Sequence, residues 1–108
     1  MARRVRILRR ALGYGPTQQG LFAAHMGWTQ PETSTYENGY RPIPAKQILV
    51  LHKRVHGLDP LWITEGRMDY MPPPLRMALE AAEKAMDAEE ASERLSGERE
   101  NVGRSERL

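Results

Sequence analysis

The sequence has no cysteine among its 108 residues. This absence excludes a disulfide framework, a thiolate metal site and a cysteine nucleophile, and it fits a reducing compartment. The chain also lacks an apolar run near the roughly 20 residues that span a bilayer. Its basic N-terminus is not followed by the uninterrupted apolar segment of a signal peptide. We therefore expect a soluble, cytoplasmic protein that does not insert into a membrane.

The residue combinations typical of catalysis and metal binding are also missing. We find no nucleophile–base constellation, no phosphate-binding loop and no paired acids in a plausible cleft, so we expect no enzymatic activity. His52 and His56 have helical spacing, but no third ligand or neighbouring carboxylate accompanies them. We interpret them as residues of a helix surface and expect neither a metal nor a cofactor.

Charge is distributed unevenly along the chain, whose formal net charge is +2. Residues 1–68 contain ten Lys/Arg and four Asp/Glu, a difference of +6, whereas residues 69–108 contain six and ten, a difference of −4. A basic domain with an acidic tail is typical of a protein that binds a polyanion. The alternative is that these charges serve solubility alone.

Apolar spacing divides the chain into a helical domain and a helical tail. Residues 1–68 have patterns for five short helices, at about 2–12, 17–25, 30–37, 44–56 and 60–64. A proline-rich linker at 69–74 is followed by an amphipathic helix at 75–95 and a tail at 96–108 that we expect to be disordered. The apolar stripe from Leu75 to Met86 either forms a dimer contact or folds back onto the domain.

The segment from Gln19 to Gly39 has the pattern of two short helices joined by a tight turn. Gly27 suits the turn because a residue without Cβ adopts positive φ at little cost. Thr29 is a suitable N-cap for the second helix, with Pro31 in its first turn, and Asn38-Gly39 is a stop signal. This spacing is that of a helix-turn-helix unit, which places its second helix in a DNA major groove.

Four motifs, in order, resemble the Cro and phage-repressor type helix-turn-helix proteins, the Xre family. They are Val5-x-x-Leu8-Arg9-x-Ala11-Leu12-Gly13, Gln19-x-x-Phe22-Ala23-x-x-Met26-Gly27, Tyr36-Glu37-Asn38-Gly39 and the segment from Gly57 to Gly66. The resemblance covers residues 5–66. It implies an all-α, compact five-helix repressor-like domain, here with a C-terminal helical tail, encoded by a bacterium or a phage. Thr33 departs from the family, which usually has an aliphatic residue there.

The resemblance also implies roles for individual residues. The residues that would face the DNA bases are Thr29, Gln30, Pro31, Glu32, Ser34 and Thr35. Those that would contact phosphates are Gln19, Asn38, Tyr40 and Arg41. Arg9 and Glu37 would form a structural ion pair between the first helix and the recognition helix.

Gln30 has one expected role, whereas Glu32 and the arginines of the first helix each have two possible roles. A glutamine can pair with adenine, and Gln30 is the residue that we expect to read a base. Glu32 either accepts from a cytosine amine or stabilises the helix N-terminus. The arginines of the first helix, Arg3, Arg4, Arg6 and Arg10, either form a phosphate-facing patch or are solvated charges.

Taken together, these features predict a sequence-specific transcriptional regulator, a repressor that binds a palindromic DNA operator as a homodimer. The alternative is an antitoxin-like or adaptor protein that keeps the helix-turn-helix fold and binds a protein partner through its C-terminal helix. Three features of the helix at 30–37 favour this alternative: Thr33, Glu32 and the absence of lysine and arginine from its reading face. The acidic stretch of the tail would compete with DNA for the basic domain.

Overall fold

The computed structural model describes the backbone of residues 1–106 and the side chains of residues 1–97. Across these residues the chain is all-α and has no strand. The helices are α1 (Ala2–Ala11), the 3₁₀ helix η1 (Pro16–Gln18), α2 (Gln19–Met26), α3 (Gln30–Glu37), α4 (Ala45–Leu49), α5 (Leu51–Arg54), α6 (Pro60–Glu65) and α7 (Pro73–Glu106). None of the described helices is long and apolar enough to cross a membrane.

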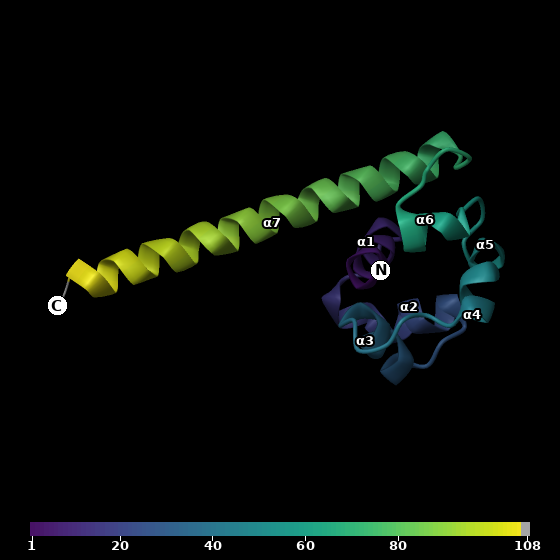
Figure 1. The fold of residues 1–108 in the computed structure, drawn as a ribbon, viewed down its shortest axis with the longest axis horizontal. Coiled ribbons are helices and arrows are strands. Elements are labelled where there is room, and N and C mark those ends of the chain that lie inside the picture. The colour runs from purple at the N-terminus through teal and green to yellow at the C-terminus, as the bar shows by residue number, and fades with distance from the viewer. Residues whose placement is uncertain (107–108) are drawn as a thin grey trace.

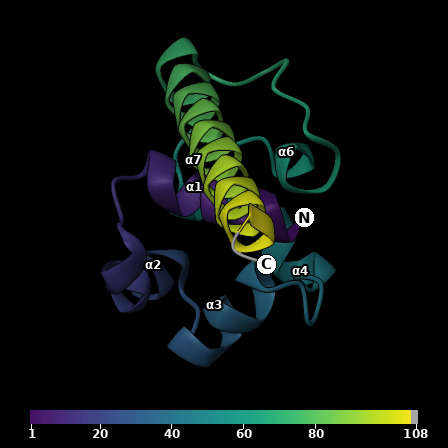
Figure 2. The same ribbon diagram turned by 90° about the vertical axis from the view of Figure 1, so that its left-hand side faces the viewer.

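Helices α1 to α6 form a compact head, and α7 is a long helix that crosses it (Figure 1). In Figure 1 α1 lies between α7 on one side and α3 on the other, and it contacts both. In Figure 2, the view turned by 90°, α7 lies across the front of α1. The C-terminal part of α7 extends beyond the head, which gives the molecule a longest dimension of 57 Å. Helix α7 therefore covers the face of α1 that is turned away from α3.

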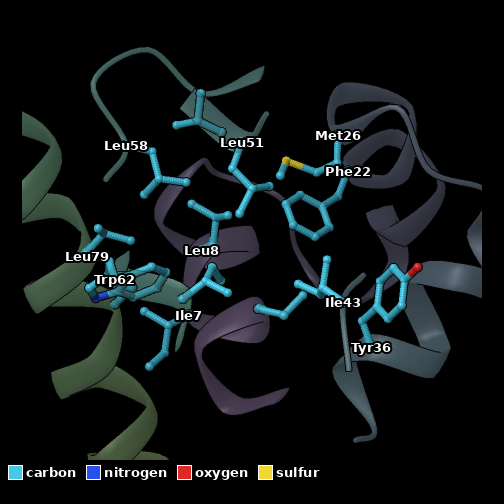
Figure 3. Close-up of a cluster of buried hydrophobic side chains, with 14 of the residues drawn as sticks. Ile7, Leu8, Phe22, Met26, Tyr36, Ile43, Leu51, Leu58, Trp62 and Leu79 are labelled. Carbon is cyan, nitrogen blue, oxygen red and sulfur yellow. The ribbon is translucent and has the colours of Figure 1, made fainter. Parts of the chain in front are cut away.

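The hydrophobic core is centred on α1, whose Val5, Ile7 and Leu8 are fully buried. Phe22 and Met26 of α2 contribute to the core next to α1 (Figure 3). On the α7 side the core contains Leu58, Trp62, Ile63 and Leu79. Burial of each large apolar side chain contributes about 1.5–3 kcal/mol, so a continuous core of this kind fixes α7 to the head.

The predicted helix at 44–56 is wrong, because the structure divides it into α4 and α5 at Val50. Val50 has φ −99° and ψ 2°, in the sparsely populated bridge region. Valine has a low helix propensity because its side chain is branched at Cβ. The break leaves Leu49 67% exposed and buries Leu51 and Val55. The head therefore contains six α-helices and η1 instead of five helices.

The boundaries of the predicted linker and tail also differ from the structure. Helix α7 begins at Pro73, inside the predicted linker, because proline is tolerated in the first turn of a helix. It continues past Leu95 to Glu106, where we expected disorder, and no proline after Pro74 interrupts its backbone hydrogen bonds. Residues 107 and 108 of the predicted tail lie outside the described residues.

The apolar stripe from Leu75 to Met86 folds back onto the domain, which is the second of the two roles that the sequence left open. Leu79, Ala82 and Met86 are buried in the core that α7 shares with α1, and Leu75 is packed against it. Two arginines of α1 also form ion pairs with acidic residues of α7. Arg3 pairs with Asp87, and Arg10 pairs with Glu89, where Nη1 donates to Oε2 at 2.8 Å.

Candidate nucleic-acid interface

The N-terminus of α3 is fixed by a reciprocal pair of hydrogen bonds. The backbone N–H of Glu32 donates to Thr29 Oγ1 at 3.2 Å, and that of Thr29 donates to Glu32 Oε1 at 3.1 Å. This capping box confirms Thr29 as the N-cap, with Pro31 in the first turn as expected. The backbone hydrogen bond from Thr29 keeps the pKa of Glu32 below its ordinary value. The carboxylate of Glu32 therefore serves the helix N-terminus, the second of its two predicted roles.

The turn before α3 depends on Gly27, which adopts the predicted left-handed conformation with φ 73°. A Cβ at this position would lie 2.8 Å from Nη2 of Arg54. The Arg54 guanidinium therefore lies across the bare glycine backbone at the α2–α3 turn. The sequence did not predict this position, because Arg54 follows Gly27 by 27 residues and belongs to no local motif.

A chain of hydrogen bonds fixes the Arg54 backbone at the same place. His25 Nε2 lies 2.9 Å from the carbonyl oxygen of Arg54, and Tyr14 Oη lies 2.9 Å from His25 Nδ1. Because a carbonyl oxygen only accepts, Nε2 carries a proton. In the neutral imidazole, Nδ1 then accepts from the Tyr14 hydroxyl. His25 thus joins the loop before η1 to the end of α5.

The rear face of α3 is buried in the head. Thr33 is 0% exposed, and its hydroxyl donates to the carbonyl oxygen of Thr29 at 3.0 Å. This bond explains how a polar residue occupies a position for which we expected an aliphatic one. Tyr36 packs its ring against Trp28 at a centroid distance of 5.0 Å, and its hydroxyl donates to Gln47 Oε1 at 3.2 Å. Burial raises the pKa of Tyr36.

The C-terminus of α3 is joined to α1 and α2 through Glu37, which is 4% exposed. Arg9 Nη1 donates to Glu37 Oε1 at 2.6 Å, which confirms the predicted ion pair. The amide of Gln19, which we expected to contact phosphate, donates to the other oxygen of Glu37. Asn38 then ends the helix, and the positive φ that stops it belongs to Gly39, at 74°.

The front face of α3 remains open. Gln30 and Pro31 are exposed, whereas Ser34 and Thr35 are half-buried. The hydroxyl of Thr35 donates to the carbonyl oxygen of Pro31 at 2.9 Å. Ser34 accepts at its carbonyl oxygen from Asn38 Nδ2 at 2.8 Å. Tyr40 and Arg41, the two expected phosphate contacts after the helix, are exposed.

The arginines of α1 do not form one patch. Arg3 and Arg10 pair with acidic residues of α7. Arg4 donates to the carbonyl oxygens of Ile63 and Thr64 at 3.2 and 3.1 Å, near the end of α6. Because α7 lies across α1 from α3 in Figure 1, the contacts of Arg3 and Arg10 are on the face away from the candidate interface. Arg6 is exposed.

No family model, curated protein or solved structure matches this chain. Within the described part of the chain, no group of three or more His, Cys, Asp or Glu residues is arranged to hold a metal ion.

Proposed function

We propose that this protein is a sequence-specific DNA-binding transcriptional regulator of the Xre type, in which α2 and α3 form a helix-turn-helix unit and α3 enters the major groove. One observation carries the proposal. The rear of α3 is fixed at its start, middle and end by Thr29, Thr33 and Glu37, while its front, with Gln30 and Pro31, is open to solvent. A rigid helix with one open polar face is what groove recognition requires.

The charges around α3 support the same function. Helix α3 contains no lysine or arginine, but exposed arginines lie at both of its ends. Arg54 lies against the turn before the helix, and Arg41 follows its C-terminus. Within the described residues neither forms an ion pair. Arginines in such positions supply the salt-dependent phosphate contacts that set the register of a protein on DNA.

The role expected of Gln19 from the sequence is modified here. Gln19 acts as a brace for Glu37, since its amide is engaged there. Asn38, Tyr40 and Arg41 remain the proposed phosphate contacts, and Gln30 is the proposed base reader, with Pro31, Ser34 and Thr35 beside it. No catalytic activity forms part of this proposal.

A repressor of this type would bind a palindromic operator as a homodimer. The stripe from Leu75 to Met86 is committed to α1, so the proposed contact between protomers lies elsewhere. The part of α7 beyond the head is the candidate, because it extends away from the core and carries Leu95 at 56% exposure.

A protein-interaction module, antitoxin-like or adaptor, is the second candidate, and two observations favour it. Glu32 is the first charged residue of α3, and it is acidic. In addition, the projecting part of α7 gives a partner protein a continuous helical surface that the head does not cover.

A fluorescence-anisotropy titration of the full chain on random duplex DNA, at two salt concentrations, tests the proposal. The wild type is compared with a Gln30→Ala, Arg41→Ala double variant. Arg76→Ala is the matched control, because it removes one exposed arginine from α7, the helix that lies across α1 from α3. We expect affinity to fall steeply with salt and to fall in the double variant alone.

Two results would count against the regulator. Equal losses of DNA affinity in the double variant and in Arg76→Ala would indicate that the DNA-binding face is not on α3. An absence of wild-type binding at low salt would favour the protein-interaction module, and the next experiment would then be a search for a partner of α7.

A further inference from the structure

We infer that the open face of α3 selects half-sites rich in A·T base pairs. This inference rests on the proposed function, because it specifies what the same helix reads. Some polar side chains of α3 form hydrogen bonds within the protein, and the others remain available to a base.

Gln30 carries the one amide that α3 keeps available. Within the described residues its side chain has no hydrogen-bond partner, and the residue is exposed. A Cβ placed on Gly20 would lie 3.4 Å from Gln30 Oε1, so the amide extends along a stretch of α2 that has no side chain. A glutamine amide pairs with adenine through N6 and N7, donating to one and accepting from the other.

The groups that would read a G·C pair are absent from α3 or engaged. Guanine is read by arginine or lysine, and α3 contains neither. Cytosine is read by a carboxylate, and α3 has two. Glu32 Oε1 accepts from the Thr29 backbone, and Glu37 accepts from Arg9 and Gln19. Glu37 is buried and Glu32 is half-exposed, and both carboxylates make contacts within the head that support the helix.

Pro31 and Thr35 give apolar groups to the surface beside Gln30, and the Ser34 hydroxyl, which accepts from Asn38 Nδ2 at 3.3 Å, does not distinguish one base pair from another. Pro31 presents a ring without a donor, and the Thr35 hydroxyl is turned to the Pro31 carbonyl oxygen. That hydrogen bond leaves the γ-methyl of Thr35 as the group available for contact. Methyl and ring surfaces of this kind contact the C5-methyl of thymine in the major groove. One amide with apolar neighbours thus fits adenine beside thymine.

Selection of duplexes from a pool with a randomised central segment, using the full chain at low salt, tests the inference. We expect the retained sites to contain runs of A·T pairs at the positions that α3 contacts. Retained sites with G·C pairs at these positions, or retention without any preference, would overturn the inference and leave DNA binding intact. A pool from which no duplex is retained would overturn the proposed function and this inference together.

Atomic substitutions in a selected site then assign the contacts. Replacing the contacted adenine by a deaza-adenine that lacks N7 should weaken wild-type binding about 5- to 150-fold. Replacing the contacted thymine by deoxyuridine, which lacks the methyl group, should weaken it roughly 3- to 5-fold.

Matched variants attribute these losses to α3. Gln30→Ala should bind the deaza-adenine site and the unmodified site equally. Gln18→Ala, which changes an exposed glutamine outside α3, should keep the full difference. If Gln30→Ala responded to the missing N7 as strongly as the wild type does, the pairing between Gln30 and adenine would be ruled out.

Discussion

Arg9 and Glu37 connect the first helix of the head to the last residue of α3, with Nη1 and Oε1 2.6 Å apart. Gln19 donates to the second oxygen of the same carboxylate. The pair lies at the junction of α1, α2 and α3, so the position of α3 depends on it. Such a buried pair contributes most clearly when one partner is removed, because the other charge is then stranded.

The first prediction concerns this pair. Glu37→Ala should lower the free energy of unfolding by about 3–5 kcal/mol, since it leaves the Arg9 guanidinium without its carboxylate. Urea denaturation monitored by circular dichroism measures the change. Glu65→Ala is the control, because it removes an exposed carboxylate that pairs with Arg67 at the surface. An unchanged denaturation midpoint for Glu37→Ala would mean that the Arg9–Glu37 pair does not stabilise the fold.

The second prediction concerns the docking of α7. Leu79 is 0% exposed against the head, so Leu79→Ala should cost about 2–5 kcal/mol. Leu95→Ala removes the same atoms from an exposed position of the same helix and should change stability by less than about 0.5 kcal/mol. Thermal and urea denaturation of both variants measure the difference. Equal effects would mean that α7 does not rest on α1 in solution.

The third prediction compares two glycines with positive φ. Gly13 has φ 90° and open space around it, whereas a Cβ at Gly57 would lie 2.6 Å from Cγ of Pro72. Gly13→Ala should therefore cost only the left-handed strain, about 1–2 kcal/mol. Gly57→Ala should cost about 1–3 kcal/mol more, because the proline ring is rigid and precedes the docked helix. Denaturation curves for the two variants test this order, and a reversed order would contradict the contact.

The fourth prediction concerns pH. The hydrogen bond from Arg10 keeps the pKa of Glu89 below its ordinary value of 4.5. A carboxylate with a lowered folded-state pKa stabilises the fold fully above its unfolded-state pKa, and this contribution is lost as the pH falls through the folded-state value. Glu89→Gln should therefore melt slightly below the wild type at neutral pH, with a difference that vanishes in acid.

The control for the pH prediction is Glu80→Gln, an exposed carboxylate of α7 that has no ion pair among the described residues. Its melting temperature should follow that of the wild type at every pH. A difference for Glu89→Gln that stayed constant from neutral to acidic pH would show that the Arg10 contact does not depend on the charge of Glu89.

Several parts of the fold and of the candidate site could be predicted because their causes are local. The N-cap at Thr29 and the positive φ at Gly27 follow from the chemistry of one or two residues, and the structure confirms both. The Arg9–Glu37 pair was predicted from a resemblance in motif spacing. The break at Val50 was not predicted, because the apolar pattern continues across it and only the packing of Leu51 and Val55 reveals it.

The sequence by itself determined where α1, α2, α3 and α6 form and which face of α1 is apolar, since backbone preference and side-chain spacing act over a few residues. Only the tertiary structure decided where distant groups meet. It brought α7 back onto α1, engaged Arg3 and Arg10 on the side away from α3, and placed Arg54 against Gly27. These contacts join residues far apart in the chain, and they depend on how whole helices pack rather than on any local pattern.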